Sequence, residues 1–157
     1  MEAPSELKSR LESLLRTQQL GVLSTQYKGQ PYASLVAFAA TEDSKYLLFA
    51  TTRSTRKYAN IASDSRVAML MDNRSNRAGD FHRAMAVTAT GNAEEVGPND
   101  KVNYLQIFLE KHPHLKDFVN APSCALLRIK IETYYLVNRF QKVFELHIEN
   151  GPDHSNH

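Results

Sequence analysis

The sequence lacks most of what would mark a secreted or membrane protein. It contains a single cysteine, Cys124, which excludes an intramolecular disulfide and a cysteine-based zinc site and suits a reducing compartment. No apolar run approaches the length of a membrane span, and residues 1–10 lack the apolar core of a signal peptide. We therefore expect a cytoplasmic protein that does not bind a membrane.

An excess of charge of one sign is also missing. Lysine and arginine number 19 and aspartate and glutamate 17, which leaves a net charge of +2 with histidine neutral. A field this weak does not recruit a polyanion, so nucleic acid is not expected as a partner. The sequence has neither a glycine-rich phosphate loop nor a dinucleotide-binding fingerprint. Any nicotinamide substrate would therefore have to bind without one.

The remaining composition is that of a folded protein with one domain. Hydrophobic residues make up 42% and charged residues 23% of the chain, which argues against overall disorder. A length of 157 residues allows one substantial core and is too short for two ordinary domains. We expect a single domain over residues 1–150 and a disordered C-terminal tail over residues 151–157, which show no periodicity.

Short apolar runs separated by turn-forming residues predict a protein that is mainly β with helices. Alternating and β-prone residues predict seven strands, over residues 20–25, 32–40, 46–50, 66–71, 84–96, 124–137 and 143–148. Helical spacing predicts helices over residues 5–16, after Thr55, after Gly97 and around residues 115–119. The first three strands are joined by short turns and should form an antiparallel meander. Gly91 inside the fifth strand predicts a bulge that curls the sheet, so we expect a small β-barrel of about six to seven mostly antiparallel strands.

The segment after the third strand has the composition of an anion-binding turn. Residues 51–57 read Thr-Thr-Arg-Ser-Thr-Arg-Lys, with four hydroxyls and three cations in seven residues. Thr55 is placed to cap a short helix whose inward face would be Tyr58, Ile61 and Ala62. A helix N-terminus favours an anion, and hydroxyl, guanidinium and ammonium donors beside it suit a phosphate. The alternative is a solvated basic turn that binds nothing.

The same segment resembles a known family motif. The pyridoxamine-5'-phosphate oxidase-like family of FMN-binding split barrels has a pattern that this chain matches, without a gap in spacing, at Phe49-Ala50-Thr51, Thr55-Arg56-Lys57, Asn60-Ile61 and Ser65-Arg66-Val67-Ala68. The resemblance extends over residues 7–148, and its specific part is confined to residues 46–71. It implies an FMN-binding split β-barrel and a homodimer with the cofactor at the subunit interface.

The resemblance also implies which residues hold the cofactor. In the family, the arginine and lysine of the basic turn hold the flavin phosphate, and the backbone of the second strand lies along the isoalloxazine ring. Carried over to this chain, the cofactor-binding residues are Ser34, Leu35, Val36, Ala37, Thr51, Thr52, Thr55, Arg56 and Lys57. Thr55 takes the place of the family's serine, and Thr51, with Thr52 beside it, would reach the phosphate or the ribityl chain.

Departures from the family pattern limit the activity that the resemblance implies. Ala50 stands where the oxidase commonly has tyrosine, and residues 83–86 contain no glutamine. The sequence has no tryptophan, and residues 132–139 differ from the segment with which the oxidase grips its substrate. Oxidation of pyridoxamine phosphate itself is therefore not expected. The implied function is an FMN-dependent oxidoreductase that passes hydride from a reduced nicotinamide or another small donor to an unknown acceptor.

Two other functions fit the same resemblance. The barrel would bind a deazaflavin or haem in place of FMN, or it would be a non-catalytic module that stores or senses a flavin. No catalytic triad or carboxylate pair stands out in the sequence. The lack of such a motif agrees with a flavoenzyme, because the cofactor performs the electron chemistry and the protein orients it.

The histidines and the cysteine have simpler explanations than metal binding. A metal site needs convergent ligands with supporting hydrogen bonds, and the histidine spacing here does not indicate one. We expect surface positions for His112, His114, His147, His154 and His157. Cys124 begins an apolar strand and is expected to be a buried, inert thiol.

Two further clusters are candidates for substrate or ring contacts. The first follows the fourth strand and consists of Asn73, Asn76, Arg77, Asp80, His82 and Arg83. His82 with Arg77, Asp80 and Arg83 would line a substrate pocket or form an ordinary strand-edge cluster. Asn73 and Asn76 would meet the flavin edge across the dimer. The second lies near the C-terminus and consists of Tyr134, Tyr135, Arg139 and Phe140. Its aromatic rings would stack on the flavin or simply pack in a strand.

Overall fold

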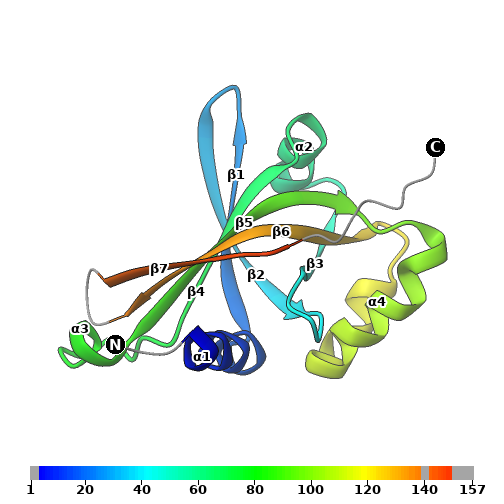
Figure 1. The fold of residues 1–157 in the computed structure, drawn as a ribbon. Helices are drawn as coiled ribbons and strands as arrows, with labels where there is room; N and C mark the ends of the chain where they lie inside the picture. The colour runs from blue at the N-terminus through cyan, green and yellow to red at the C-terminus, as the bar shows by residue number, and fades with distance from the viewer. Residues whose placement is uncertain (1–3, 139–141, 150–157) are drawn as a thin grey trace.

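The protein folds into a closed antiparallel β-barrel with helices packed around it (Figure 1). Its structure is a computed structural model that describes residues 4–138 and 142–149. The strands are β1 (Leu20–Tyr27), β2 (Gln30–Ala40), β3 (Tyr46–Thr52), β4 (Arg66–Asp72), β5 (Met85–Glu95), β6 (Cys124–Asn138) and β7 (Lys142–His147). The predicted fold class, mainly β with helices, is confirmed.

The strand order shows how the barrel closes. The order is β3-β2-β1-β4-β5-β6-β7, and an additional pairing of β3 with β6 closes the first six strands. β6 has 15 residues, and β3 pairs with its first part while β7 pairs with its last part. The predicted meander of β1, β2 and β3 is confirmed. Lys28 and Gly29 form the turn between β1 and β2 with φ values of 48° and 81°, as a two-residue hairpin turn requires.

Helices cover the ends and sides of the barrel. They are α1 (Pro4–Thr17), α2 (Arg56–Ser63), α3 (Asp80–Arg83), α4 (Pro98–Lys111), the 3-10 helix η1 (Pro113–Leu115) and α5 (Lys116–Asn120). α1 contacts β2 and β4, and α4 contacts β2 and β3. The sequence did not predict α3, because its 4 residues are too few to show helical periodicity. None of the helices in the described ranges combines the length and apolar composition needed to cross a membrane.

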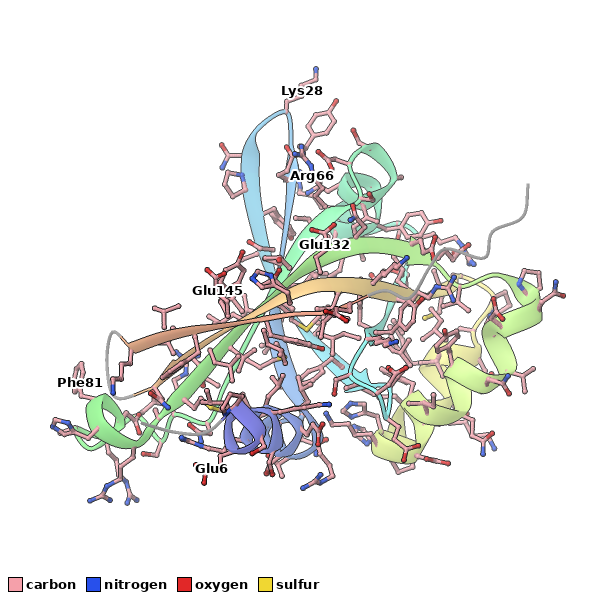
Figure 2. The ribbon with its side chains drawn as sticks, in the orientation of Figure 1. Glu6, Lys28, Arg66, Phe81, Glu132 and Glu145 are labelled. Carbon is pink, nitrogen blue, oxygen red and sulfur yellow. The ribbon has the colours of Figure 1, made fainter. Side chains whose placement is uncertain are left out.

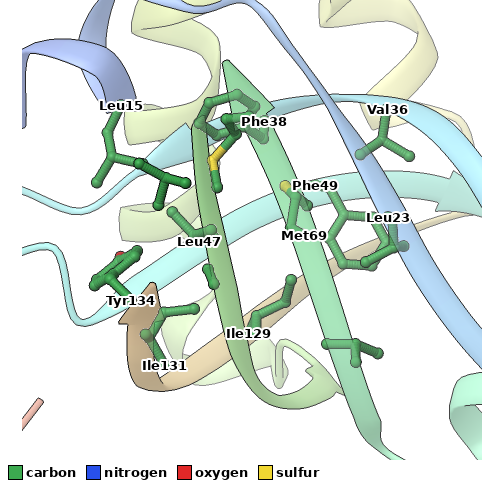
Figure 3. Close-up of a cluster of buried hydrophobic side chains, with 14 of the residues drawn as sticks. Leu15, Leu23, Val36, Phe38, Leu47, Phe49, Met69, Ile129, Ile131 and Tyr134 are labelled. Carbon is green, nitrogen blue, oxygen red and sulfur yellow. The ribbon is translucent and has the colours of Figure 1, made fainter. Parts of the chain in front are cut away.

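The inward-facing residues of the strands fill the barrel. Phe38, Leu47, Phe49 and Met69 are fully buried there (Figure 3), because side chains alternate between the two faces of each strand. Tyr134 lies in the same core, and its hydroxyl donates a hydrogen bond of 2.6 Å to the carbonyl of Ser44. Tyr134 therefore packs in the core and is not available to stack on a bound flavin.

The bulge predicted at Gly91 is present. The register between β5 and β6 shifts between Thr90 and Gly91. A Cβ atom at Gly91 would overlap the carbonyl group of Lys130 on β6. Glycine is therefore required here because the backbones of two barrel strands approach more closely than a side chain permits.

His112 is buried, which contradicts the prediction of a surface histidine. It follows α4, is 1% exposed, and its Nε2 lies 2.7 Å from the carbonyl oxygen of Phe38. A carbonyl only accepts, so the neutral ring carries its proton on Nε2. The His-Pro-His sequence reads as a polar turn, and the burial arises from the packing of α4 against β2, which is a long-range contact.

The buried ring of His112 should make stability depend on pH. Burial lowers the pKa of His112 below its ordinary value, with further lowering by the charges of Lys111 and His114, while the hydrogen bond to Phe38 opposes the shift. Between the lowered pKa and about 6.5 the unfolded chain binds more protons, so stability falls as the pH decreases. We expect the free energy of unfolding to fall more steeply on acidification in the wild type than in His112→Gln. Urea unfolding at a series of pH values measures this, and parallel profiles would contradict it.

Two further histidines and the cysteine lie where the sequence predicts them. His114 and His147 are exposed, as predicted, and His154 and His157 lie outside the described residues. Cys124 is buried, also as predicted, and burial raises the pKa of its thiol. The tail predicted to be disordered, residues 151–157, lies outside the described residues as well.

Candidate functional site

The barrel is split between β2 and β3, and the split is the opening of the candidate site. The two strands pair over only three residue positions, from Ala40 opposite Leu47 to Phe38 opposite Phe49. Both strands continue beyond the last of these pairs without joining again. The stretch of β2 predicted to lie along the flavin ring, residues 34–37, forms one side of this split.

Along the split, β2 presents backbone groups that pair with none of the strands the structure describes. Successive residues of a strand direct their N–H and C=O groups to alternate edges. Phe38 donates its N–H to the carbonyl of Gln19 on the β1 side. Ala33 and Leu35 therefore direct their backbone groups toward the split, where the described strands provide no ladder partner. This edge can hydrogen-bond to a flat ligand.

Ser34 has a buried hydroxyl that finds no hydrogen-bond partner among the described residues. Its Oγ is inaccessible to solvent, and no group in the described part of the chain bonds to it. An unsatisfied buried hydroxyl costs roughly 1–3 kcal/mol, and native proteins keep few of them. Its neighbour Leu35 is 65% exposed on the outer face. The orphaned hydroxyl beside the split fits a ligand that supplies the missing partner.

Hydroxyl groups organise the turn at the end of β3. Thr55 has extended backbone angles and accepts a hydrogen bond of 3.3 Å from the N–H of Tyr58, so the predicted helix cap is confirmed. The Oγ1 atoms of Thr51 and Thr55 are 2.8 Å apart, and Thr55 Oγ1 lies 3.0 Å from the carbonyl oxygen of Thr52. These contacts give the turn a defined shape before any ligand binds.

The buried face of α2 differs from the predicted one. Ile61 is buried as predicted and Tyr58 is partly buried, but Ala62 is exposed and Asn60 is buried in its place. Asn60 Nδ2 donates a hydrogen bond of 3.0 Å to Thr25 Oγ1 on β1. The apolar pattern misses Asn60 because a polar residue is buried here through a partner that is distant in sequence.

The two arginines of the turn have different environments. Arg53 Nε donates to Glu95 Oε1 at 3.0 Å, and Arg53 Nη1 donates to the carbonyl of Pro122 at 2.8 Å. Arg56 and Lys57, in the first turn of α2, form no ion pair with any residue that the structure describes. The cations left available for an anion are therefore the two that the sequence predicted.

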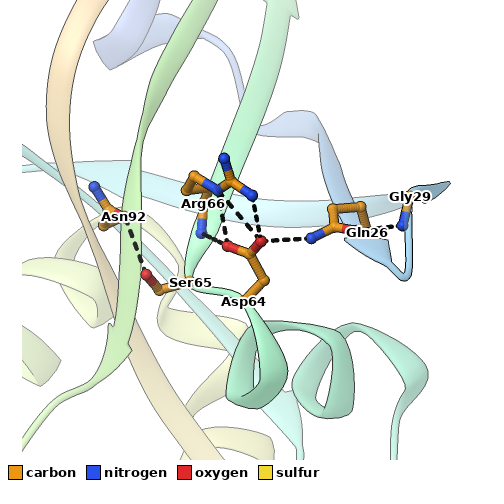
Figure 4. Close-up of polar contacts among 6 residues, drawn as sticks. All are labelled: Gln26, Gly29, Asp64, Ser65, Arg66 and Asn92. Atoms are coloured by element: carbon orange, nitrogen blue, oxygen red, sulfur yellow. Dashed lines mark hydrogen bonds and ion pairs between the residues drawn. The ribbon is translucent and has the colours of Figure 1, made fainter.

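A polar network fixes the β1–β2 hairpin to the C-terminal end of α2 (Figure 4). Asp64 accepts hydrogen bonds from Arg66 Nη2 at 2.7 Å and from Gln26 Nε2 at 2.6 Å, and Gln26 accepts from the N–H of Gly29. The hydrogen bonds from Arg66 hold the pKa of Asp64 well below its usual range. The carboxylate thus stays charged, and the network holds the hairpin in place over α2.

The structure does not bring the cluster after β4 to this site within one chain. Phe81 on α3 lies at the opposite end of the molecule from Lys28 and Arg66 (Figure 2). The carboxylate of Asp80 accepts hydrogen bonds from the N–H groups of Ser75 and Asn76 at 2.9 and 2.7 Å, which stabilises that loop by itself. Arg139 and Phe140 of the C-terminal cluster lie outside the described residues.

The outer face of the sheet carries an apolar row that the sequence analysis did not identify. The register places Val22 of β1 opposite both Leu35 of β2 and Leu70 of β4. Leu35 and Leu70 are 65% and 39% exposed, and Leu20 at the start of β1 is 51% exposed. Adjacent exposed apolar side chains of this kind mark an interaction surface more often than scattered ones do.

A split β-barrel with a turn rich in hydroxyls and cations at its opening is the class of protein that this fold and site define. The chain belongs to the pyridoxamine 5'-phosphate oxidase family, whose family model matches residues 7–138. This confirms the family resemblance of the sequence. A comparison with curated proteins found no match.

Solved structures share the fold at low sequence identity. General stress protein 26 from Bacillus anthracis has a TM-score of 0.69 and 21% identity, covering 91% of this chain and 99% of that one. An FAD-binding protein from Mesorhizobium loti has a TM-score of 0.67 and 20% identity, covering 82% and 90%. A haem-binding protein from Mycobacterium smegmatis has a TM-score of 0.80 and 15% identity, covering 94% of this chain and 60% of that one. Identities this low establish a shared fold and nothing further.

Proposed function

We propose that this protein binds FMN, with the phosphate at the N-terminus of α2. The observation that carries the proposal is the pair Arg56 and Lys57, which begins this helix beside the split and forms no ion pair within the described ranges. The unpaired N–H groups of a helix start, an arginine and a lysine together favour a dianionic phosphate. Thr51, Thr52 and Thr55 line the same turn and place hydroxyl groups beside it.

The isoalloxazine ring would lie along the open edge of β2. The backbone groups of Ala33 and Leu35 offer donors and acceptors there, and the buried hydroxyl of Ser34, which has no partner among the described residues, lies between them in sequence. A flat ring with a polar edge can use such groups without strict demands on side chains, which agrees with the varied apolar residues at 35–37. The fold shared with an FAD-binding protein supports a flavin as the ligand class.

We also propose that the working form is a homodimer with the cofactor at its interface. The apolar row of Leu20, Val22, Leu35 and Leu70 lies on β1, β2 and β4, and Leu35 belongs to the same stretch of β2 that borders the split. A second copy packed on this face would bury the row and cover one side of the bound ring. Two identical rows meeting about a twofold axis would account for their exposure in one chain.

The proposed activity is electron transfer between a reduced nicotinamide or another small donor and an acceptor. A bound flavin would supply the hydride chemistry itself. The residues of the chain would act by binding and orientation: Arg56 and Lys57 fix the phosphate, and the β2 backbone fixes the ring. The apolar outer face, once covered by the partner, would keep water from the ring.

The proposal predicts that the purified protein is yellow. We expect FMN to be released on denaturation, at about one molecule per subunit, and identified by mass and absorption spectrum. Recovery of haem or a deazaflavin would replace the cofactor assignment, and a purified protein that neither contains nor binds FMN would overturn it. Oxidation of a reduced nicotinamide with turnover distinguishes an oxidoreductase from a non-catalytic flavin module, which would show none.

A further inference from the structure

Tyr32 lies beside the proposed phosphate site, and neither the core nor the proposed function accounts for it. It is near the start of β2 and is 40% exposed. The Cζ atom of Arg56 lies over its ring, 5.7 Å from the ring centroid. This separation is within the range of a cation–π interaction. Because residues two apart share a face of a strand, Tyr32 is on the same face as Ser34 with its unpaired hydroxyl.

Contact with an aromatic ring leaves the N–H donors of an arginine available, whereas an ion pair occupies them. A guanidinium carries five N–H donors in its plane, and a ring that meets its face leaves those donors free. Arg53 shows the opposite case, because its Nε and Nη2 are directed at Glu95 and its Nη1 at Pro122. Arg56 has the ring of Tyr32 as its support and no carboxylate partner in the described part of the chain.

We infer that Tyr32 is a positioning residue for the cofactor phosphate, which holds Arg56 beside the split so that its N–H donors are oriented before the ligand arrives. This inference rests on the proposed function. An exposed arginine otherwise samples many rotamers and loses that freedom when it binds, which weakens binding. The Asp64 network fixes the β1–β2 hairpin, which carries Tyr32, to the C-terminal end of α2, and this gives Tyr32 a stable position beside Arg56.

The same hairpin provides a matched control. Tyr27 is 47% exposed, and Lys28 Nζ lies 5.4 Å from its ring centroid. Lys28 is at the tip of the hairpin and points away from the body of the molecule (Figure 2). Tyr27→Leu therefore removes a tyrosine of similar exposure and similar contact to a cation, at a place that does not border the split.

The test compares two ligands that differ only in the phosphate. Flavin-free protein is titrated with FMN and with riboflavin, and binding is followed by flavin fluorescence. Tyr32→Leu should weaken FMN binding about two- to fivefold and leave riboflavin binding unchanged, as expected for loss of one exposed cation–π contact. Tyr32→Phe should retain wild-type affinity, because the ring is kept, and Tyr27→Leu should change neither ligand. In an Arg56→Ala background, Tyr32→Leu should cause no further loss.

Other results would overturn the inference. Equal weakening of FMN and riboflavin would mean that Tyr32 contacts the flavin ring, and an additive loss in the Arg56→Ala background would mean that it acts independently of Arg56. Loss of affinity in Tyr32→Phe would point to the hydroxyl and not to the ring. Failure of the proposed function looks different, because the wild-type protein would then bind neither FMN nor riboflavin.

Discussion

The Arg56→Ala/Lys57→Ala variant is expected to lose at least about 100-fold in FMN affinity while it remains folded. Hydrogen bonds to charged groups contribute about 1.5–3 kcal/mol each, so the loss of two such donors amounts to about 3–6 kcal/mol. Neither side chain forms an ion pair with a described residue, so their removal leaves no buried charge unpaired. Fluorescence titration with FMN measures the affinity, and circular dichroism reports the fold.

Arg53→Ala is the matched control for this variant. Arg53 belongs to the same turn, but its guanidinium is bound to Glu95 and Pro122. We expect Arg53→Ala to keep FMN affinity within about twofold and to lose a modest amount of stability, on the order of 1 kcal/mol. If the double variant binds FMN as tightly as the wild type, the phosphate site is not at the start of α2.

Gly91→Ala is expected to destabilise the fold by about 3 kcal/mol or more. The new Cβ would overlap the carbonyl of Lys130, and that group is part of the backbone of β6. A side chain could rotate away from such a clash, but here β5 and β6 must separate, and their ladder is the longest in the barrel. Guanidinium unfolding of the purified variant measures the change in the free energy of unfolding.

A second glycine separates this steric effect from a general effect of alanine. Gly97 has an ordinary φ of −71°, and a Cβ atom there would meet nothing within 4 Å. Gly97 is the N-cap of α4, where alanine is somewhat less favourable than glycine, so Gly97→Ala should cost no more than about 1 kcal/mol. Equal stability of the Gly91 variant and the wild type would show that the bulge can relax and that the close approach is not rigid.

Most of the fold could be predicted from local sequence patterns. The alternation of Leu127, Ile129 and Ile131 with charged residues places β6 with one face in the core, and the structure agrees. Gly91 predicted the bulge because a glycine inside a strand indicates a close approach of two backbones. α3 was missed because it is a single turn, and His112 was misplaced because its burial depends on α4 reaching β2. The two errors have different causes: a single turn is too short to show periodicity, and long-range packing leaves little trace in a short window of sequence.

Only the contiguous part of the candidate site could be predicted from the sequence. Its turn is contiguous, so hydroxyls and cations in residues 51–57 could be recognised together, with Thr55 as the cap. The contact of Arg56 with Tyr32 joins residues 24 positions apart in sequence, and the binding of Arg53 by Glu95 spans 42. No motif encodes either one. Which of the two arginines is free to bind an anion is a property of the folded chain and not of the turn alone.

The ladder between β2 and β3 pairs only three residue positions, as does that between β1 and β4, so the barrel can open between β2 and β3 with a small loss of hydrogen bonds. A ligand bound both to the β2 edge and to the start of α2 would link the two elements and add interactions to those of the short β2–β3 ladder. Ligand binding and closure of the barrel would then be thermodynamically coupled. The ligand-bound protein would therefore be less flexible and more stable than the ligand-free protein.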